Sequence, residues 1–149
     1  MKSYEDFNVG DEFMTQGRTI TDADVVLFAG LTGDYNPIHV DEEFSKQRSV
    51  FKTRVVHGLF TLSVAEGLFF SYGWLESGNA ITVSYNDVKF TEPVFIGDTI
   101  HFSGKVKMKR ESKSNPGWGI IEIGMTGLNQ KNIAFLSFEH VYLVRRKGE

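Results

Sequence analysis

The sequence contains no cysteine among its 149 residues and only three prolines. The lack of cysteine excludes disulfides, cysteine-ligated metals and thiol nucleophiles, and it fits a reducing compartment such as the cytoplasm. The formal net charge is −3 and neither end carries a cluster of lysine and arginine, which argues against a nucleic-acid partner. The first residues are acidic and mixed, without the apolar segment of a signal peptide.

Long hydrophobic runs and phosphate-binding loop motifs are missing as well. The most apolar stretch, residues 59–70, is much shorter than the roughly 20 residues of a membrane-spanning helix, and it contains a glutamate and a serine. The sequence has 41% hydrophobic and 23% charged residues, which is the composition of a soluble globular protein. We therefore expect a cytoplasmic protein with no membrane segment and one domain spanning residues 1–149.

The first half of the chain carries helix signals. Thr21 and Asp24 form a capping-box pattern, and Gly33 is placed to end the helix that starts there. Asn36 precedes a proline, which biases it toward an extended backbone. Residues 41–46 predict one short helical turn.

Residues 57–72 predict a second helix that is apolar on nearly all sides, so we expect protein to surround most of it. Helical spacing places Leu59, Ser63, Glu66 and Phe70 on one face. Ser63 could contact a substrate or bond back to a carbonyl one turn earlier. Glu66 needs a partner if it is buried, and it could be a structural or dimer-contact group or a catalytic base.

After Gly78 the apolar residues alternate with polar ones, as they do in strands. The alternation changes phase at residues 86–87, which predicts a β-bulge. Further strands are predicted over residues 100–109, 118–128 and 133–145. An antiparallel sheet that curves around the apolar helix would cover most of that helix, so the sequence predicts an α+β fold. The faces and the long edge that remain open favour a homodimer.

The stretch GDYNPIH, residues 33–39, places a carboxylate (Asp34), an amide (Asn36) and an imidazole (His39) between the two predicted helices. Adding water next to a carbonyl needs groups that move protons and a donor for the enolate oxygen. Asp34 and His39 can converge on one water if the chain bends at Pro37. The alternative is a polar turn closed by an Asx hydrogen bond, and on the residues alone both interpretations stay open.

His57 and Gly58 open the predicted apolar helix. The first turn of a helix offers free N–H groups and the positive end of the helix dipole, and a glycine lets a ligand approach the backbone closely. This arrangement suits a thioester or enolate oxygen, but on these residues alone an ordinary helix start is the favoured interpretation. We interpret His57 itself as structural.

LTGDYNPIHVDEEF, followed further along the chain by VVHGLFTLSVAEGL, resembles the MaoC-like, (R)-specific enoyl-CoA hydratase family. The resemblance covers nearly the whole chain, and the pattern G-D-x-N-P-hydrophobic-H is complete. It implies a hotdog fold, in which a curved antiparallel sheet wraps around a long central helix. The implied reaction is the reversible addition of water to a trans-2-enoyl-CoA, giving the (R)-3-hydroxyacyl-CoA.

The resemblance also implies roles for individual residues. Asp34 and His39 would be the catalytic pair. The substrate-binding residues would be Asn36, which positions that pair, Gly58, whose N–H holds the thioester oxygen, and Ser63. The resemblance further implies that coenzyme A is part of the substrate and that the assembly is a homodimer. It implies no metal or other cofactor.

Two rival functions remain open. A hotdog acyl-CoA thioesterase would use a carboxylate on the central helix, for which Glu66 is the candidate. A non-catalytic acyl-CoA-binding subunit would bind the ligand without turnover. The intact GDYNPIH stretch argues against the thioesterase, and the joint presence of its polar residues with Gly58 argues against the binding subunit.

Overall fold

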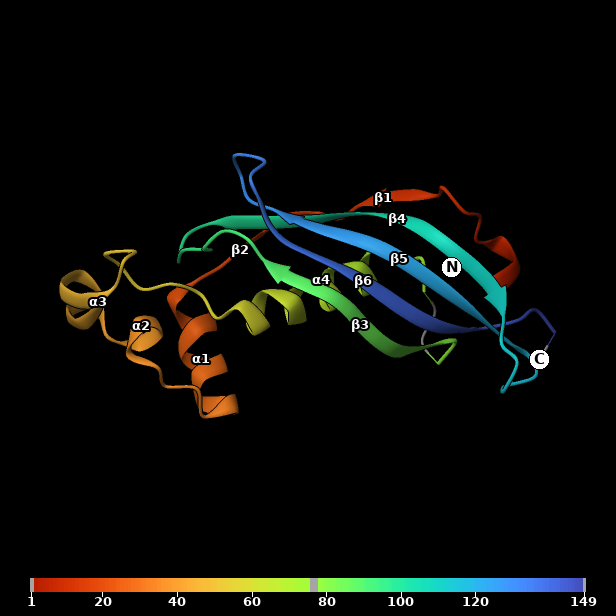
Figure 1. Cartoon of the computed structure of the whole chain (residues 1–149), viewed down its shortest axis with the longest axis horizontal. Helices are drawn as coiled ribbons and strands as arrows, with labels where there is room; N and C mark the ends of the chain where they lie inside the picture. The colour runs from red at the N-terminus through yellow and green to blue at the C-terminus, as the bar shows by residue number, and fades with distance from the viewer. Residues whose placement is uncertain (1, 76–77, 149) are drawn as a thin grey trace.

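The computed structural model describes residues 2–75 and 78–148, and it consists of a curved antiparallel sheet with one long helix on its inner side (Figure 1). Three shorter helices lie together beyond one end of the sheet, and both chain termini lie toward the other end (Figure 1). The elements in chain order are η1 (Tyr4–Asp6), β1 (Glu12–Met14), β2 (Arg18–Thr19), α1 (Asp22–Thr32), α2 (Pro37–Val40), α3 (Glu42–Arg48), α4 (Gly58–Tyr72), β3 (Ala80–Phe90), β4 (Thr99–Glu111), β5 (Trp118–Leu128) and β6 (Ala134–Arg145).

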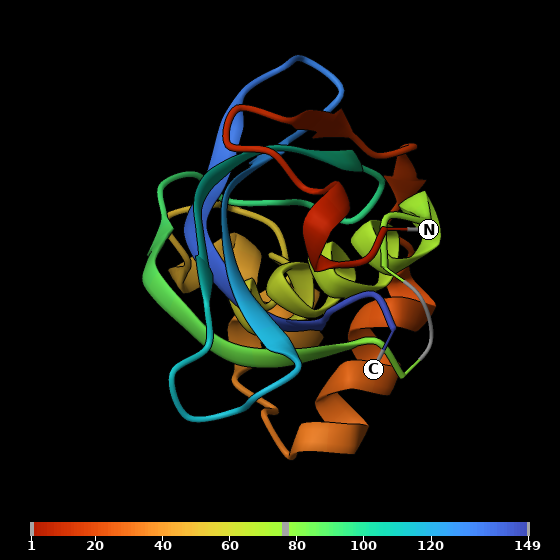
Figure 2. The ribbon, with the colours of Figure 1, turned by 90° about the vertical axis from the view of Figure 1, so that its right-hand side faces the viewer.

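The strands pair in the order β1-β4-β5-β6-β3, and β2 makes a second short pairing with β4. All of these pairings are antiparallel. Figure 2 shows the strands curling around α4. Alternate side chains of β5 are buried, among them Ile121, Ile123 and Met125, so one face of the sheet is committed to the core. The predicted α+β class, a curved antiparallel sheet around a central helix, is confirmed.

The predicted bulge in the first long strand is also confirmed. The register between β3 and β6 shifts between Asn86 and Lys89, and Asp87 has a φ of 51°. A positive φ at one residue lets the strand take up an extra residue and change which face it presents. A second shift, between Thr82 and Ser84, is a finding that the sequence pattern did not predict.

Helix α4 packs one side against the sheet. Its buried side chains are Thr61, Val64, Ala65, Leu68 and Phe69. Burying each large apolar side chain contributes about 1.5–3 kcal/mol, so this side holds the helix in the concavity. Gly73, with a φ of 88°, ends the helix in the left-handed conformation that glycine adopts readily.

The other side of α4 is uncovered in the single chain, and it continues onto the outer strand β3. We call this surface the open face and define it by Leu59, Ser63, Glu66 and Phe70 of α4 with Ile81, Val83 and Tyr85 of β3. Leu59 is 63% exposed and Val83 is 54% exposed. The expectation that protein surrounds most of the helix is therefore met on the sheet side only.

The helical end of the molecule begins as the sequence predicts. The Thr21 hydroxyl accepts from the Asp24 N–H, the Asp24 carboxylate accepts from the Thr21 N–H at 2.9 Å, and Gly33 ends α1 with a φ of 76°. Where one short turn was predicted, two short helices follow, because Pro37 starts α2 and Asp41 caps α3. No helix within the described ranges has the length and apolar character needed to cross a membrane.

The segment before α4 fastens these short helices to one another. Arg54 forms an ion pair with Asp22 at the start of α1, at 2.7 Å, and a second one with Glu42 at the start of α3, at 3.3 Å. The Arg54 backbone N–H also donates to Glu42. One guanidinium therefore links the first and third short helices beside the chain that leads into the central helix.

Candidate active site

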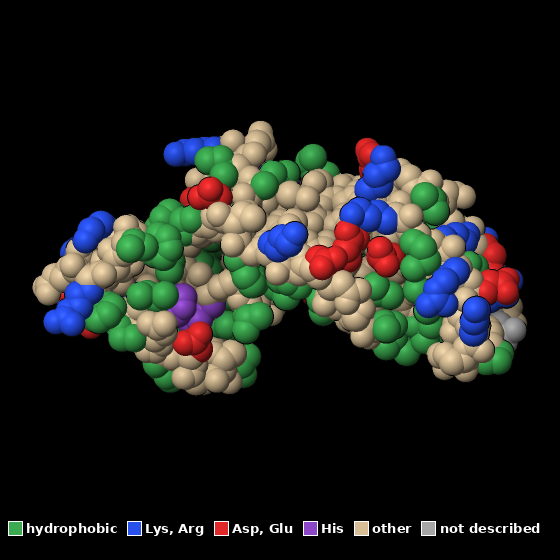
Figure 3. Space-filling model, viewed as in Figure 1, with side chains coloured by type: hydrophobic (Ala, Val, Ile, Leu, Met, Phe, Trp, Pro, Cys, Tyr) green, Lys and Arg blue, Asp and Glu red, His purple; other side chains and the backbone are tan. Residues whose placement is uncertain are grey.

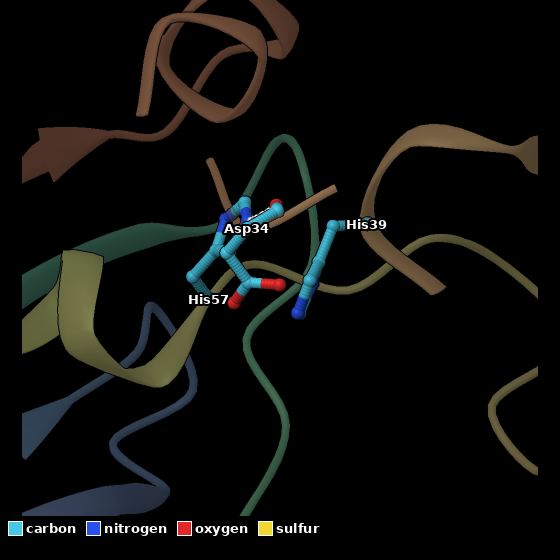
Figure 4. Close-up of side chains that lie close together, drawn as sticks. All are labelled: Asp34, His39 and His57. Atoms are coloured by element: carbon cyan, nitrogen blue, oxygen red, sulfur yellow. Dashed lines mark hydrogen bonds between the residues drawn. The ribbon is translucent and has the colours of Figure 1, made fainter. Parts of the chain in front are cut away.

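Asp34, His39 and His57 come together at the helical end of the molecule (Figure 4). One carboxylate oxygen and one nitrogen from each imidazole lie within 4.8 Å of one another. Asp34 follows α1, His39 lies in α2, and His57 immediately precedes α4. Figure 3 shows histidine side chains in a hollow at this end, flanked by hydrophobic side chains and next to an acidic one.

The loop that carries Asp34 is shaped by local hydrogen bonds. The Asp34 N–H donates to the Thr32 hydroxyl and the Asn36 N–H donates to the Asp34 carboxylate, both at 3.3 Å. The Asn36 side-chain oxygen accepts from the Ile38 N–H and caps α2. The turn with an Asx hydrogen bond, one of the two interpretations of this stretch, is therefore present. It is also what turns the carboxylate toward the imidazoles (Figure 4).

His39 is buried, and a backbone carbonyl fixes its tautomer. Its Nδ1 lies 2.6 Å from the Val55 carbonyl oxygen, which can only accept, so Nδ1 carries the hydrogen and the neutral ring has its lone pair on Nε2. Burial lowers the pKa of His39 below its ordinary value; the Val55 carbonyl and the Asp34 carboxylate oppose this shift, and the neighbouring His57 adds to it. The ring is thus kept neutral, with a free nitrogen beside a carboxylate.

His57 is the functional candidate that sequence reasoning treated as structural. It is only 2% exposed, its Nε2 lies 3.0 Å from the Asp34 carbonyl oxygen, and its ring stacks on His39 with centroids 3.8 Å apart. Phe28 of α1 contacts the His57 ring edge-on. One signal could have found it: His57 occupies the N-cap position of α4, where serine, threonine, asparagine and aspartate are the usual residues.

These three side chains have the donor types of a metal site, but their arrangement does not fit one. An ion bound by both imidazoles must lie in the planes of both rings and close to their edges. The two rings are inclined by only 25° and are stacked 3.8 Å apart, so no such point exists between them. The geometry suits proton transfer between a carboxylate and an imidazole instead.

A cavity of about 300 Å³ lies at the start of α4, beside the 55–58 segment. Most of its walls are apolar, and they include Phe51, Val56, Phe90, Val94 and Phe135. Gly58 also lines it, with a backbone N–H in the first turn, where such groups have no partner within the helix. A Cβ on Gly58 would lie 2.9 Å from the Phe90 ring, so the close packing of that ring requires glycine here.

Ser63, one of the predicted substrate-binding residues, is not brought to this cavity. Its hydroxyl donates to the Leu59 carbonyl at 2.9 Å, one turn back along α4. It lines a different hollow with Arg18 and Phe60. The geometry of the single chain therefore matches the structural interpretation of Ser63.

Glu66 also has structural partners. Its Oε2 accepts hydrogen bonds from the hydroxyls of Tyr85 and Tyr142, each at 3.0 Å, and His140 Nδ1 lies 3.4 Å away. Burial, followed by the Glu66 charge, raises the pKa of Tyr85 to about 12, so its hydroxyl remains a donor. Glu66 is not among the residues that line the cavity at Gly58.

Comparison with known proteins identifies the family to which the chain belongs. Residues 6–123 match the family model for the MaoC like domain. Protein MaoC of Klebsiella aerogenes is 39% identical over 110 residues, which are 72% of this chain and 31% of that protein. The (R)-specific enoyl-CoA hydratase of Rhodospirillum rubrum is 38% identical over 97 residues, which are 65% of this chain and 64% of that protein. The chain thus spans less than two thirds of the length of these curated relatives.

Solved structures extend the likeness to the whole fold. The MaoC-like dehydratase from Rhodospirillum rubrum matches with a TM-score of 0.88 at 26% identity, and the match covers 100% of both chains. A conserved hypothetical protein from Mycobacterium tuberculosis with a double hotdog fold matches at 16% identity and a TM-score of 0.86, over 99% of this chain and 45% of that one. The latter shows the fold alone, which is the hotdog fold. By its matched residues and its relatives, the chain belongs to the MaoC-like dehydratase domain family.

Proposed function

We propose that this protein is an (R)-specific enoyl-CoA hydratase that adds water to a trans-2-enoyl-CoA and also catalyses the reverse dehydration. The observation that carries the proposal is the pairing of the Asp34 carboxylate with a buried His39 whose Nε2 is free, next to the apolar cavity at Gly58. The names of the relatives, an (R)-specific enoyl-CoA hydratase and a 3-hydroxybutyryl-CoA dehydratase among them, support it.

In the proposed reaction one water molecule lies between Asp34 and His39. Its oxygen forms a bond to C3 of the enoyl group, and the pair takes up the proton that leaves the water. The electrons of the double bond move toward the thioester oxygen, which the Gly58 N–H and the positive end of the α4 dipole stabilise. The pair then returns a proton to C2, so that one water is added in total and no charge is left over.

The state of His39 supports its part in this reaction. A neutral imidazole at pH 7 can accept a proton, and burial holds the pKa of His39 below its ordinary value of 6.5. The Asp34 carboxylate, turned toward the same space, supplies the opposite charge when the ring becomes protonated. Asp34 and His39 carry the proton transfers together, and the reverse reaction uses the same two groups by microscopic reversibility.

The proposal requires coenzyme A only as part of the substrate, and it includes no metal or other cofactor. Asn36 positions the pair through the α2 cap, and an additional substrate contact by Ser63 stays a prediction. We further infer a homodimer that forms through the open face. This face has exposed apolar side chains, and it includes β3, the last strand in the sheet order. A cytoplasmic location stays a prediction from the cysteine-free sequence.

The test is the hydration of crotonyl-CoA by the wild-type chain and by Asp34→Asn, with the product stereochemistry determined by chiral chromatography. The wild type should form (R)-3-hydroxybutyryl-CoA. The amide of Asp34→Asn keeps the shape but not the charge, and should lower kcat by about a hundredfold or more. Asp87→Asn, at an exposed bulge of β3, is the matched control and should keep the wild-type rate.

The same assay separates the rival functions. Release of free coenzyme A thiol without hydration would identify a thioesterase. Binding of enoyl-CoA without any turnover over a range of chain lengths would identify a non-catalytic subunit. An Asp34→Asn variant that folds and turns over at the wild-type rate would show that the proposed pair is wrong.

A further inference from the structure

His57 lies between the two parts of the proposed site. It hydrogen-bonds to the loop that carries Asp34, and it is the residue before Gly58, whose N–H is the proposed oxygen donor. The carbonyl of Asp34 can only accept, so the 3.0 Å contact requires a hydrogen on His57 Nε2. Both imidazoles of the site therefore donate to a backbone carbonyl, His39 through Nδ1 and His57 through Nε2.

The His57 bond restrains a loop that is otherwise held only by its own neighbours. Within the described residues, the other hydrogen bonds of residues 33–36 join groups no more than four residues apart, such as Gly33 N–H to the Ala29 carbonyl and Asp34 N–H to the Thr32 hydroxyl. The bond to His57 spans 23 residues and reaches a side chain that is 98% buried. Within the described part of the chain, it is the bond that fixes this exposed loop to the central helix.

The same ring also fixes His39. The stacked rings are inclined by 25° with centroids 3.8 Å apart, and Phe28 contacts the His57 ring on its edge, so neither imidazole can turn without displacing the other. One buried side chain thus holds the backbone of Asp34 by a hydrogen bond and the ring of His39 by contact.

We propose that His57 is a positioning residue of the hydratase site, which sets the distance between the Asp34 carboxylate and His39 Nε2. This inference rests on the proposed function. His57 does not act on the substrate; it acts through Asp34 and His39. Losing either its donor or its ring should change catalysis more than substrate binding, because His57 is not among the residues that line the cavity.

Two substitutions separate the two roles. His57→Gln keeps an N–H donor within reach of the Asp34 carbonyl but removes the stacked ring. His57→Phe keeps a flat ring against His39 but removes the donor. We expect kcat for crotonyl-CoA to fall about tenfold or more in His57→Phe with KM changed less than about threefold, and His57→Gln to recover part of the loss.

The pH profile is the second measurement. The titratable groups whose charge acts on His39 are His57 and Asp34. Glu42 of α3 and Arg54 of the following segment are paired with each other. His57 contributes to lowering the pKa of His39, so its replacement raises that pKa. The acidic limb of kcat/KM should therefore move to higher pH in both variants, which a purely structural role would not cause.

The tautomers give a readout that is independent of activity. Long-range ¹H–¹⁵N NMR spectra of the wild-type protein should show the hydrogen on Nδ1 of His39 and on Nε2 of His57. A hydrogen on Nδ1 of His57 would remove the bond to Asp34 and overturn the proposal, even if a substituted chain failed to fold.

The controls for the kinetic measurements are His101→Gln and His101→Phe, the same changes at a histidine of β4 outside the site. Both should keep the wild-type kcat and pH profile.

The outcomes distinguish this inference from the proposed function. If the wild type hydrates crotonyl-CoA and both His57 variants match its kcat and pH profile, the positioning role is wrong and the hydratase stands. If the wild type hydrates no enoyl-CoA, the proposed function fails and the positioning role fails with it. A loss in kcat with a shifted acidic limb and the expected tautomers supports both.

Discussion

The hydroxyl of Tyr142, which is 2% exposed, donates to the carboxylate of Glu66 at 3.0 Å on the inner side of the sheet. Tyr85 donates to the same oxygen, so one carboxylate of α4 satisfies hydroxyl groups from both β3 and β6. A buried hydroxyl without a partner is costly, which gives Glu66 a structural reason to be in an otherwise apolar helix.

We predict that Glu66→Ala lowers the free energy of unfolding by about 2 kcal/mol, because it leaves a buried tyrosine hydroxyl without its acceptor. Glu66→Gln keeps an acceptor oxygen and should lose less. Urea unfolding followed by circular dichroism measures both changes. If the wild type releases free thiol from an acyl-CoA and a folded Glu66→Gln chain does not, the structural role is contradicted and the thioesterase is favoured.

We predict that Gly58→Ala destabilises the protein by about 1–3 kcal/mol, because the added methyl group meets the Phe90 ring at 2.9 Å. Phe90→Ala in the same chain removes the clash, so the double variant should be more stable than the sum of the single changes predicts. Gly67→Ala is the matched control in the same helix. Nothing lies within 4 Å of its Cβ position, and it should raise stability slightly.

We predict a loss of stability in acid that depends on His140. Burial lowers the pKa of this ring to about 3. The Glu66 oxygen 3.4 Å from its Nδ1 already accepts from two tyrosines. The unfolded chain takes up the proton below its ordinary pKa of 6.5, while the folded chain does not until about pH 3. Stability is therefore fully present above pH 6.5 and decreases as the pH falls from there toward 3, by up to about 1.4 kcal/mol per pH unit.

The measurement for His140 is urea unfolding at several pH values between 7 and 4, for the wild type and His140→Gln. Glutamine cannot take up this proton, so the variant should show a shallower dependence on pH. Equal slopes for the two chains would mean that His140 does not remain neutral in the folded protein as predicted.

We predict that Val83→Asp converts the proposed homodimer to a monomer. Val83 is 54% exposed on the open face, and a charge placed there would lose its water on association without gaining a partner. Light scattering coupled to size-exclusion chromatography gives the mass. Val9→Asp, at a valine that is 64% exposed outside the open face, should leave the mass unchanged, and a wild-type chain that is already monomeric would refute the dimer.

The elements that could be predicted from the sequence are those whose cause lies in adjacent residues. The cap at Thr21, the stop at Gly33 and the bulge near Asp87 each depend on a local hydrogen bond or a local φ. The short strands β1 and β2 could not be predicted in this way, because they exist through pairing with β4. Phe13 of β1, for example, pairs with Gly104, which has no side chain and leaves room for the phenyl ring.

The same distinction between local and long-range causes applies to the candidate site. Asp34 and His39 lie five positions apart, and the turn residues between them predicted that they could converge. The contribution of His57 depends on a hydrogen bond across 23 residues and on a stacked ring. Neither contact can be predicted from the spacing of neighbouring residues. The bond from the Ser63 hydroxyl to its own helix is local, and it was one of the two alternatives that the sequence left open.

The 55–58 segment has a consequence for how such an enzyme can change over evolutionary time. The Val55 carbonyl and the His57 ring hold the proposed proton-transfer groups, while the side chain of Val56 and Gly58 in the same segment line the cavity. Substitutions in the cavity wall, at Phe51 or Phe135 for instance, can alter which acyl groups are accepted while the proposed proton-transfer pair stays unchanged. Residues away from this four-residue segment can therefore change the substrate while the segment preserves the reaction.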